Sequence, residues 1–255
     1  MKLGLRIPDI KNLSLEEKVD LAVECRLDAI ELSASELMDH DITRRLKEYA
    51  EKRNITITSA GIGIDLCNPQ SRDEVRENMK LILEGAKILG GIPLFSRTMV
   101  ADEGVGQEET WKNVIEFTRE ITEICASENI TFSIEIDHSP CFVHNLERFE
   151  KLYKKVNHVN LHLNFDPTNL LVNGSDPFES IEKWGHLFTG GHIKDGVFRT
   201  DKRSEVPLGQ GEVDYLNIFK ALEQRGIDLT FQFEHLQHPD EVKQAATYMH
   251  GLLGK

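Results

Sequence analysis

The stretch ITFSIEIDH, residues 130–138, decides the fold. It is a short run rich in β-branched and aromatic residues, as a buried strand is, and it ends in acidic residues and a histidine. A helical pattern follows at 146–156, and another apolar run begins at 159. A strand, a helix and a second strand at this spacing predict a parallel β-α-β unit.

The same unit recurs along the whole chain. Short apolar runs predict eight strands, at 3–6, 29–32, 55–58, 92–95, 130–136, 159–165, 191–194 and 229–233. Helical periodicity follows each of them, beginning at Leu15 and then covering 42–50, 72–89, 108–128, 146–156, 178–184, 215–224 and 239–253. Eight such units without a linker predict a single (β/α)8 TIM barrel over residues 1–255. An open doubly wound sheet is less favoured, because RIPD (6–9) replaces its usual glycine-rich turn after the first strand.

Composition excludes several classes of partner. The chain has 43 acidic and 30 basic residues, and a net charge of −13 repels both nucleic-acid phosphates and anionic membrane surfaces. No apolar run approaches the roughly 20 residues of a membrane span, and no signal-peptide core follows Met1. The cysteines form no metal-spaced pair; they are Cys25, Cys67, Cys125 and Cys141. They predict reduced thiols in a cytoplasmic protein.

Polar residues end the last four predicted strands, where a TIM barrel places its active site. Each strand offers one metal-ligating side chain: Glu135, Asp166, His192 and Glu234. Neighbouring staves of a closed barrel let these side chains converge. Three carboxylates in contact repel one another, and a divalent cation relieves that repulsion. The set suits Mn²⁺, Mg²⁺ or Co²⁺ better than structural zinc, because no thiolate is offered. The alternative is that such acids merely cap the helices that follow.

These strand ends resemble the xylose isomerase-like superfamily of TIM barrels, which contains sugar and sugar-phosphate isomerases and epimerases. The motifs that carry the resemblance are SIEIDH (133–138), NFDPTN (164–169), HIKD (192–195), FE (233–234) and PLGQGEVDY (207–215). The resemblance is specific from about residue 130 onward.

The resemblance implies one divalent ion held by Glu135, Asp166, His192 and Glu234, most often Mn²⁺, with Mg²⁺, Co²⁺ or Zn²⁺ as alternatives. It also implies that Glu135 and Glu234 are the catalytic pair of an isomerase or epimerase. The expected substrate is a small carbohydrate (a ketose, keto-sugar or cyclitol) that loses a proton at a carbon next to a metal-bound carbonyl. Dehydration of a keto-cyclitol at the same site remains an alternative. Relatives of this kind often pair, so a homodimer or homotetramer is expected.

Four further residues are predicted to bind substrate. Lys194 shares a strand face with His192, although an ion pair with an acid such as Asp195 is the alternative. Arg199 lies in the loop after the seventh strand. Glu31 ends the second strand, where a structural role is also open. Asn169 stands where the family often has a histidine, and its amide can bind a hydroxyl but does not titrate near neutral pH.

Two other functions share this architecture. Apurinic-site endonucleases use the same barrel, but they hold several zinc ions with histidines that the early strands here lack, and the charge of −13 is wrong for a DNA groove. A non-catalytic sugar-binding barrel would keep the pocket but would be expected to lose the glutamate pair. The sequence therefore favours the carbohydrate isomerase or epimerase.

Overall fold

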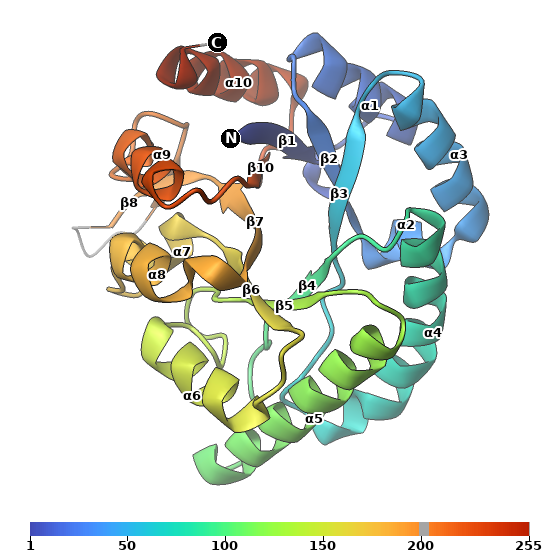
Figure 1. The fold of residues 1–255 in the computed structure, drawn as a ribbon, viewed down its shortest axis with the longest axis vertical. Helices are drawn as coiled ribbons and strands as arrows, with labels where there is room; N and C mark the ends of the chain where they lie inside the picture. Colours follow the sequence, from blue (N-terminus) through green and yellow to red (C-terminus); the bar gives the residue numbers. More distant parts are fainter. Residues whose placement is uncertain (199–203, 255) are drawn as a thin grey trace.

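The computed structural model describes residues 1–198 and 204–254. Eight parallel strands close into a barrel in the order β1-β10-β7-β6-β5-β4-β3-β2, and helices surround it (Figure 1). The barrel strands are β1 (Lys2–Arg6), β2 (Ala29–Ser33), β3 (Thr56–Gly61), β4 (Leu94–Ser96), β5 (Phe132–Glu135), β6 (Leu161–Phe165), β7 (Phe188–Ile193) and β10 (Thr230–Phe233). The predicted (β/α)8 TIM barrel is confirmed.

The helices occur close to where periodicity predicts them, with two short additions, α2 and α7. They are α1 (Leu15–Glu24), α2 (Ala34–Met38), α3 (His40–Glu51), α4 (Arg72–Ile88), α5 (Gln107–Ser127), α6 (Leu146–Val156), α7 (Pro167–Val172), α8 (Pro177–Trp184), α9 (Tyr215–Gln224) and α10 (Pro239–Leu253). Among the described residues, no helix is both long enough and apolar enough to cross a membrane.

Pairing of the first and last barrel strands closes the ring. Leu3 of β1 lies opposite Phe231 of β10, and Leu5 lies opposite Phe233. All four side chains are fully buried, so the closure is made in the apolar core. At about 1.5–3 kcal/mol for each large apolar side chain buried, this seam is a substantial part of what holds the two ends of the chain together. It also brings the residues that follow β1 and β10 to one rim.

The seventh strand begins at Phe188 and not at 191 as predicted. Gly190 therefore lies inside the strand with Gly191, and not in the loop before it. A Cβ on Gly191 would approach the Phe231 ring to 2.6 Å and the Phe165 carbonyl oxygen to 2.7 Å. Glycine therefore lets β7 pack closely against its neighbours. The fourth strand is also displaced. It begins after Pro93, whose nitrogen has no hydrogen for a strand ladder.

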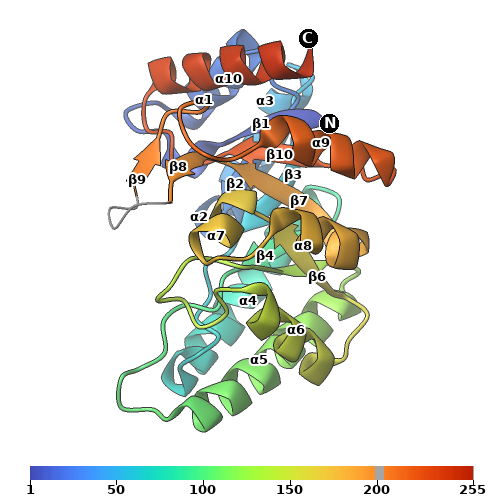
Figure 2. The ribbon, with the colours of Figure 1, turned by 90° about the vertical axis from the view of Figure 1, so that its left-hand side faces the viewer.

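A small antiparallel hairpin, which periodicity does not predict, follows β7. It consists of β8 (Asp195–Val197) and β9 (Ser204–Val206) and stands beside the barrel (Figure 2). The Asp195 carboxylate accepts hydrogen bonds from the backbone amides of residues 196, 209, 211 and 213, at 2.9 to 3.3 Å. The segment 207–213 is thus folded around one buried carboxylate at the base of the hairpin.

Candidate active site at the mouth of the barrel

Four side chains from neighbouring strands converge at one end of the barrel. They are Glu135, Asp166, His192 and Glu234, and one ligand atom from each lies within 4.8 Å of the others. All four residues are buried, with exposures between 0% and 9%. Glu135 ends β5, Asp166 and Glu234 directly follow β6 and β10, and His192 lies near the end of β7. The structure therefore brings together the whole predicted ligand set.

The two carboxylate oxygens of Asp166 have different roles. Its Oδ1 accepts the backbone N–H of Asn169 at 2.9 Å and so caps α7, whose first residue is Pro167. Its Oδ2 lies 2.7 Å from Nζ of Lys194 as an ion pair, but accepts no well-aligned hydrogen bond from any described residue. The helix-capping alternative and the ligand alternative are therefore compatible, because capping fixes one oxygen and leaves the other for the cluster.

His192 sits between carboxylates on both sides of its ring. Nδ1 is 3.1 Å from Oε1 of Glu135, and Nε2 is 3.1 Å from Oε1 of Glu31. Burial works to lower the pKa of His192, but Glu234, Glu135 and Glu31 together raise it well above its usual value. The edge of the ring also packs on Phe95 of β4, with ring centroids 5.2 Å apart. The imidazole is thus held in one orientation, with Nδ1 toward the four-residue cluster.

Lys194 places a buried ammonium among the acids. Nζ lies 2.7 Å from Asp166 and 2.6 Å from Glu234. The structure thus shows the ion-pair alternative for Lys194, but with these two acids and not with Asp195, which accepts hydrogen bonds from backbone amides. Burial opposes the charged form, but the two acids outweigh it and the pKa of Lys194 is raised well above its usual value. The ammonium therefore neutralises part of the negative charge that the barrel mouth concentrates.

The two glutamates of the cluster have opposite electrostatic settings. Burial raises the pKa of Glu135 beyond what the cation at His192 can offset. Burial also acts on Glu234, but His192 and Lys194 prevail and hold its pKa well below the usual range. Two neighbouring carboxyl groups with displaced pKa values are typical of acid–base chemistry.

The predicted substrate contacts lie in different places. Asn169 is buried, and its Nδ2 donates to Oε1 of Glu135 at 3.3 Å. Glu31 is 1% exposed and lies behind His192, where it also accepts hydrogen bonds from Arg6 and Ser59, both at 2.8 Å. Arg199 lies outside the described residues. Contacts of these residues with a substrate stay predictions.

A cavity of about 210 Å³ opens above the cluster, and its wall includes residues that the sequence analysis did not select. Arg6 reaches Glu31 at 2.8 Å and lies 3.8 Å from Glu234. Arg97 lies in the wall of the same cavity and donates a hydrogen bond to Asp137 at 2.8 Å. Each of these residues ends or directly follows a strand, so the rule that found the cluster would have found them if applied to the early strands.

Comparisons with known proteins agree with this geometry. The model of a family described as "Xylose isomerase-like TIM barrel" matches residues 19–252. A protein of Haemophilus influenzae, provisionally named L-ribulose-5-phosphate 3-epimerase SgbU, is 27% identical over 83% of this chain and 80% of its own length.

Solved structures share the fold at lower identity. A probable 3-DHS dehydratase, AsbF from Bacillus anthracis, superposes with a TM-score of 0.83 at 20% identity and covers 98% of both chains. A protein named IOLI, solved with a bound zinc atom, superposes with a TM-score of 0.81 at 22% identity over 100% of this chain and 98% of its own. At these identities the similarity concerns the fold.

Proposed function

The chain belongs to the xylose isomerase-like TIM barrel family, as its strand-end motifs predicted, and we propose that it is a divalent-metal-dependent isomerase or epimerase of a small carbohydrate. The observation that carries the proposal is the convergence of three carboxylates and one imidazole, with ligand atoms within 4.8 Å, at the catalytic end of the barrel. The name of the relative SgbU, a sugar-phosphate epimerase, supports the same class of reaction.

The donor set fits a divalent cation. Among the described residues, Oδ2 of Asp166 has only an ion pair with Lys194, and Nδ1 of His192 faces Glu135 rather than an apolar wall. We propose Glu135, Asp166, His192 and Glu234 as the ligands and Mn²⁺ as the ion, because oxygen-rich sites of this kind favour Mn²⁺ and Mg²⁺. When bound, the ion supplies Lewis-acid stabilisation of the negative charge that develops beside the deprotonated carbon.

Glu135 and Glu234 are the proposed proton-transfer pair. One carboxylate oxygen takes a proton from the carbon next to the substrate carbonyl, and the other carboxyl group returns a proton. Return to the opposite face of the same carbon is epimerisation, and return to the neighbouring carbon is isomerisation. The cation at Lys194 beside Glu234 and the amide of Asn169 beside Glu135 keep the two carboxyl groups in place.

Lys194 and Asn169 are also the proposed substrate contacts, because both carry donors beside a catalytic carboxyl group. Arg199 is proposed as a further contact from its sequence position alone. For Glu31 we propose a different role from the sugar contact that the sequence analysis expected. Its carboxylate is enclosed by His192, Arg6 and Ser59, so it orients the imidazole.

Hydrogen–deuterium exchange tests the proposal. The protein is incubated in deuterated water with Mn²⁺ and a panel of D-fructose, D-tagatose, L-ribulose and 2-keto-myo-inositol, and NMR records deuterium at the carbon next to the carbonyl. Exchange should need the metal and should fall by at least about 100-fold in Glu234→Gln. The matched control is Glu223→Gln on the exposed face of α9.

The outcomes separate the alternatives. Exchange without loss of a hydroxyl supports the isomerase or epimerase, whereas release of water from the cyclitol identifies the dehydratase. Binding of the sugars without exchange identifies a non-catalytic barrel. Exchange that survives chelation or the Glu234→Gln substitution contradicts the proposed site.

A further inference from the structure

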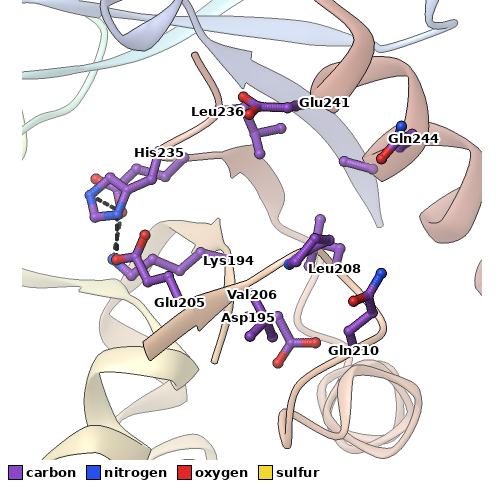
Figure 3. Close-up of a pocket in the computed structure, with 13 residues that line it drawn as sticks. Lys194, Asp195, Glu205, Val206, Leu208, Gln210, His235, Leu236, Glu241 and Gln244 are labelled. Atoms are coloured by element: carbon purple, nitrogen blue, oxygen red, sulfur yellow. Dashed lines mark hydrogen bonds and ion pairs between the residues drawn. The ribbon is translucent and has the colours of Figure 1, made fainter. Parts of the chain in front are cut away.

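A second cavity of about 330 Å³ adjoins the one above the acid cluster. It lies between the β8–β9 hairpin, the loop after β10 and the first half of α10 (Figure 3). Lys194, Glu234 and His235 line both cavities. These three residues form the boundary between the two cavities, so a ligand that is held at the cluster lies next to the second cavity.

The wall of the second cavity is part apolar and part amide. Val206, Leu208 and Leu236 supply apolar surface, and the Gln210 and Gln244 side chains face the same space. In the described part of the chain, neither glutamine amide has a hydrogen-bond partner. Each amide can both donate and accept. A wall of this kind fits a group that has C–H faces and a rim of hydroxyls.

The charges around the second cavity disfavour an anion. Four carboxylates line it: Asp195, Glu205, Glu234 and Glu241. The two basic groups in the wall already have acidic partners, because Lys194 pairs with Glu234 and Asp166, and Nδ1 of His235 lies 2.7 Å from Glu205. Among the described residues of this wall, a phosphate would meet acids without a cation left to bind it, so an uncharged group is favoured.

The frame of the second cavity is already formed. Asp195 holds the segment after β9 through four backbone amides, and the contact between Glu205 and His235 ties the hairpin to the end of β10. On the other side, Glu241 accepts the backbone N–H groups of residues 237 and 238 and so fixes the start of α10. A preformed cavity spares a ligand part of the cost of ordering its site.

We propose that the second cavity is a subsite for a second, uncharged sugar ring, so that the protein acts on the ketose unit of a disaccharide or glycoside. The inference rests on the proposed function for the site of the ketose unit. Size supports it as well. The cavity above the cluster, at about 210 Å³, is smaller than the range of about 300–1,000 Å³ typical of ligand pockets, and the adjoining 330 Å³ brings the combined space into that range.

A series of keto-disaccharides tests the subsite. Isomaltulose, maltulose, lactulose and turanose all carry a fructose unit, but each attaches the second ring differently. Calorimetry measures their affinities for the Mn²⁺-loaded protein beside those of D-fructose and D-fructose 6-phosphate. We compare the wild type with Gln244→Trp, which places a large side chain in the cavity from an exposed position of α10, and with Gln224→Trp, a matched change at an exposed position of α9 outside it.

At least one disaccharide should bind about tenfold or more tightly than D-fructose, a difference of about 1.4 kcal/mol. Gln244→Trp should remove that preference, and Gln224→Trp should keep it. The subsite is overturned if no disaccharide is preferred, if the preference survives Gln244→Trp, or if the phosphate gains an affinity that Gln244→Trp abolishes. Deuterium exchange in the same samples reports separately on the reaction: a Gln244-dependent preference without exchange keeps the subsite and refutes the enzyme.

Discussion

Replacing Glu31 with glutamine tests how the barrel orients its histidine. The Glu31 carboxylate lies 3.1 and 3.3 Å from Nε2 of His192. Burial would raise the pKa of Glu31, but His192 and Arg6 outweigh it and the pKa is lowered, so Glu31 is charged. A charged acceptor at Nε2 keeps the proton on that nitrogen and leaves Nδ1 for the cluster. Glutamine keeps the shape but removes the charge and offers a competing N–H.

The expected loss follows from these contacts. Substitution of a residue that orients a metal-ligating histidine costs about 10–100-fold in metal affinity, or about 1.4–2.7 kcal/mol. The free energy of unfolding should also fall, because Arg6 loses the negative charge of its partner at 2.8 Å and the new N–H group meets a donor. Arg6 keeps Asp9 at 3.2 Å and Glu234 at 3.8 Å. The fall should therefore be about 1–3 kcal/mol, the cost of one unsatisfied buried group, and less than the cost of an isolated charge.

Two measurements check the prediction. Calorimetric titration gives the Mn²⁺ affinity of the wild type, of Glu31→Gln and of Glu48→Gln, a control at an exposed position of α3. Urea unfolding of the metal-free proteins gives the stability change. The reasoning is refuted if Glu31→Gln binds Mn²⁺ as the wild type does and raises only the ketose concentration needed for half-maximal rate. Glu31 would then be the sugar ligand that the sequence analysis expected.

Two further predictions concern buried charge and buried thiols. Lys194→Met should lower the unfolding free energy of the metal-free protein by about 3–5 kcal/mol, because Asp166 and Glu234 lose their buried cation. Mn²⁺ should then raise the melting temperature of the variant more than that of the wild type. Equal stabilities of the two metal-free proteins would contradict the prediction. Burial raises the pKa of three thiols to about 12, those of Cys67, Cys125 and Cys141. They stay neutral at about pH 8, so a thiol-specific disulfide reagent should label these three slowly in the native protein and label all four cysteines after unfolding. Rapid labelling of Cys67, Cys125 or Cys141 in the native protein would disprove the burial argument.

The sequence was sufficient for the barrel and for the members of the acid cluster, for a physical reason. Strand and helix periods are local, and a residue at the end of a buried parallel strand has only one rim to occupy once the sheet closes. Glu135, Asp166, His192 and Glu234 could thus be selected without knowing a single contact. What local periodicity missed is short or irregular: Gly191 sits inside β7 because two neighbouring strands leave no room for a Cβ, and a three-residue strand such as β8 has too few residues to show a period.

The contact between Glu31 and His192 shows what the position of a residue at the end of a strand does not predict. The two residues are separated by 161 positions, and they meet because β1, between β2 and β10, closes the ring. Glu31 ends a strand like the cluster residues, so the rule finds it but assigns it to the substrate. Its actual partners are decided by depth: a carboxylate that is 1% exposed and already satisfied by an arginine, a serine and an imidazole has little capacity left for a sugar hydroxyl. Strand ends therefore predict which residues face the mouth of a barrel. The number of hydrogen bonds that such a residue already makes decides its role: it either binds the substrate itself or supports another residue that binds the substrate.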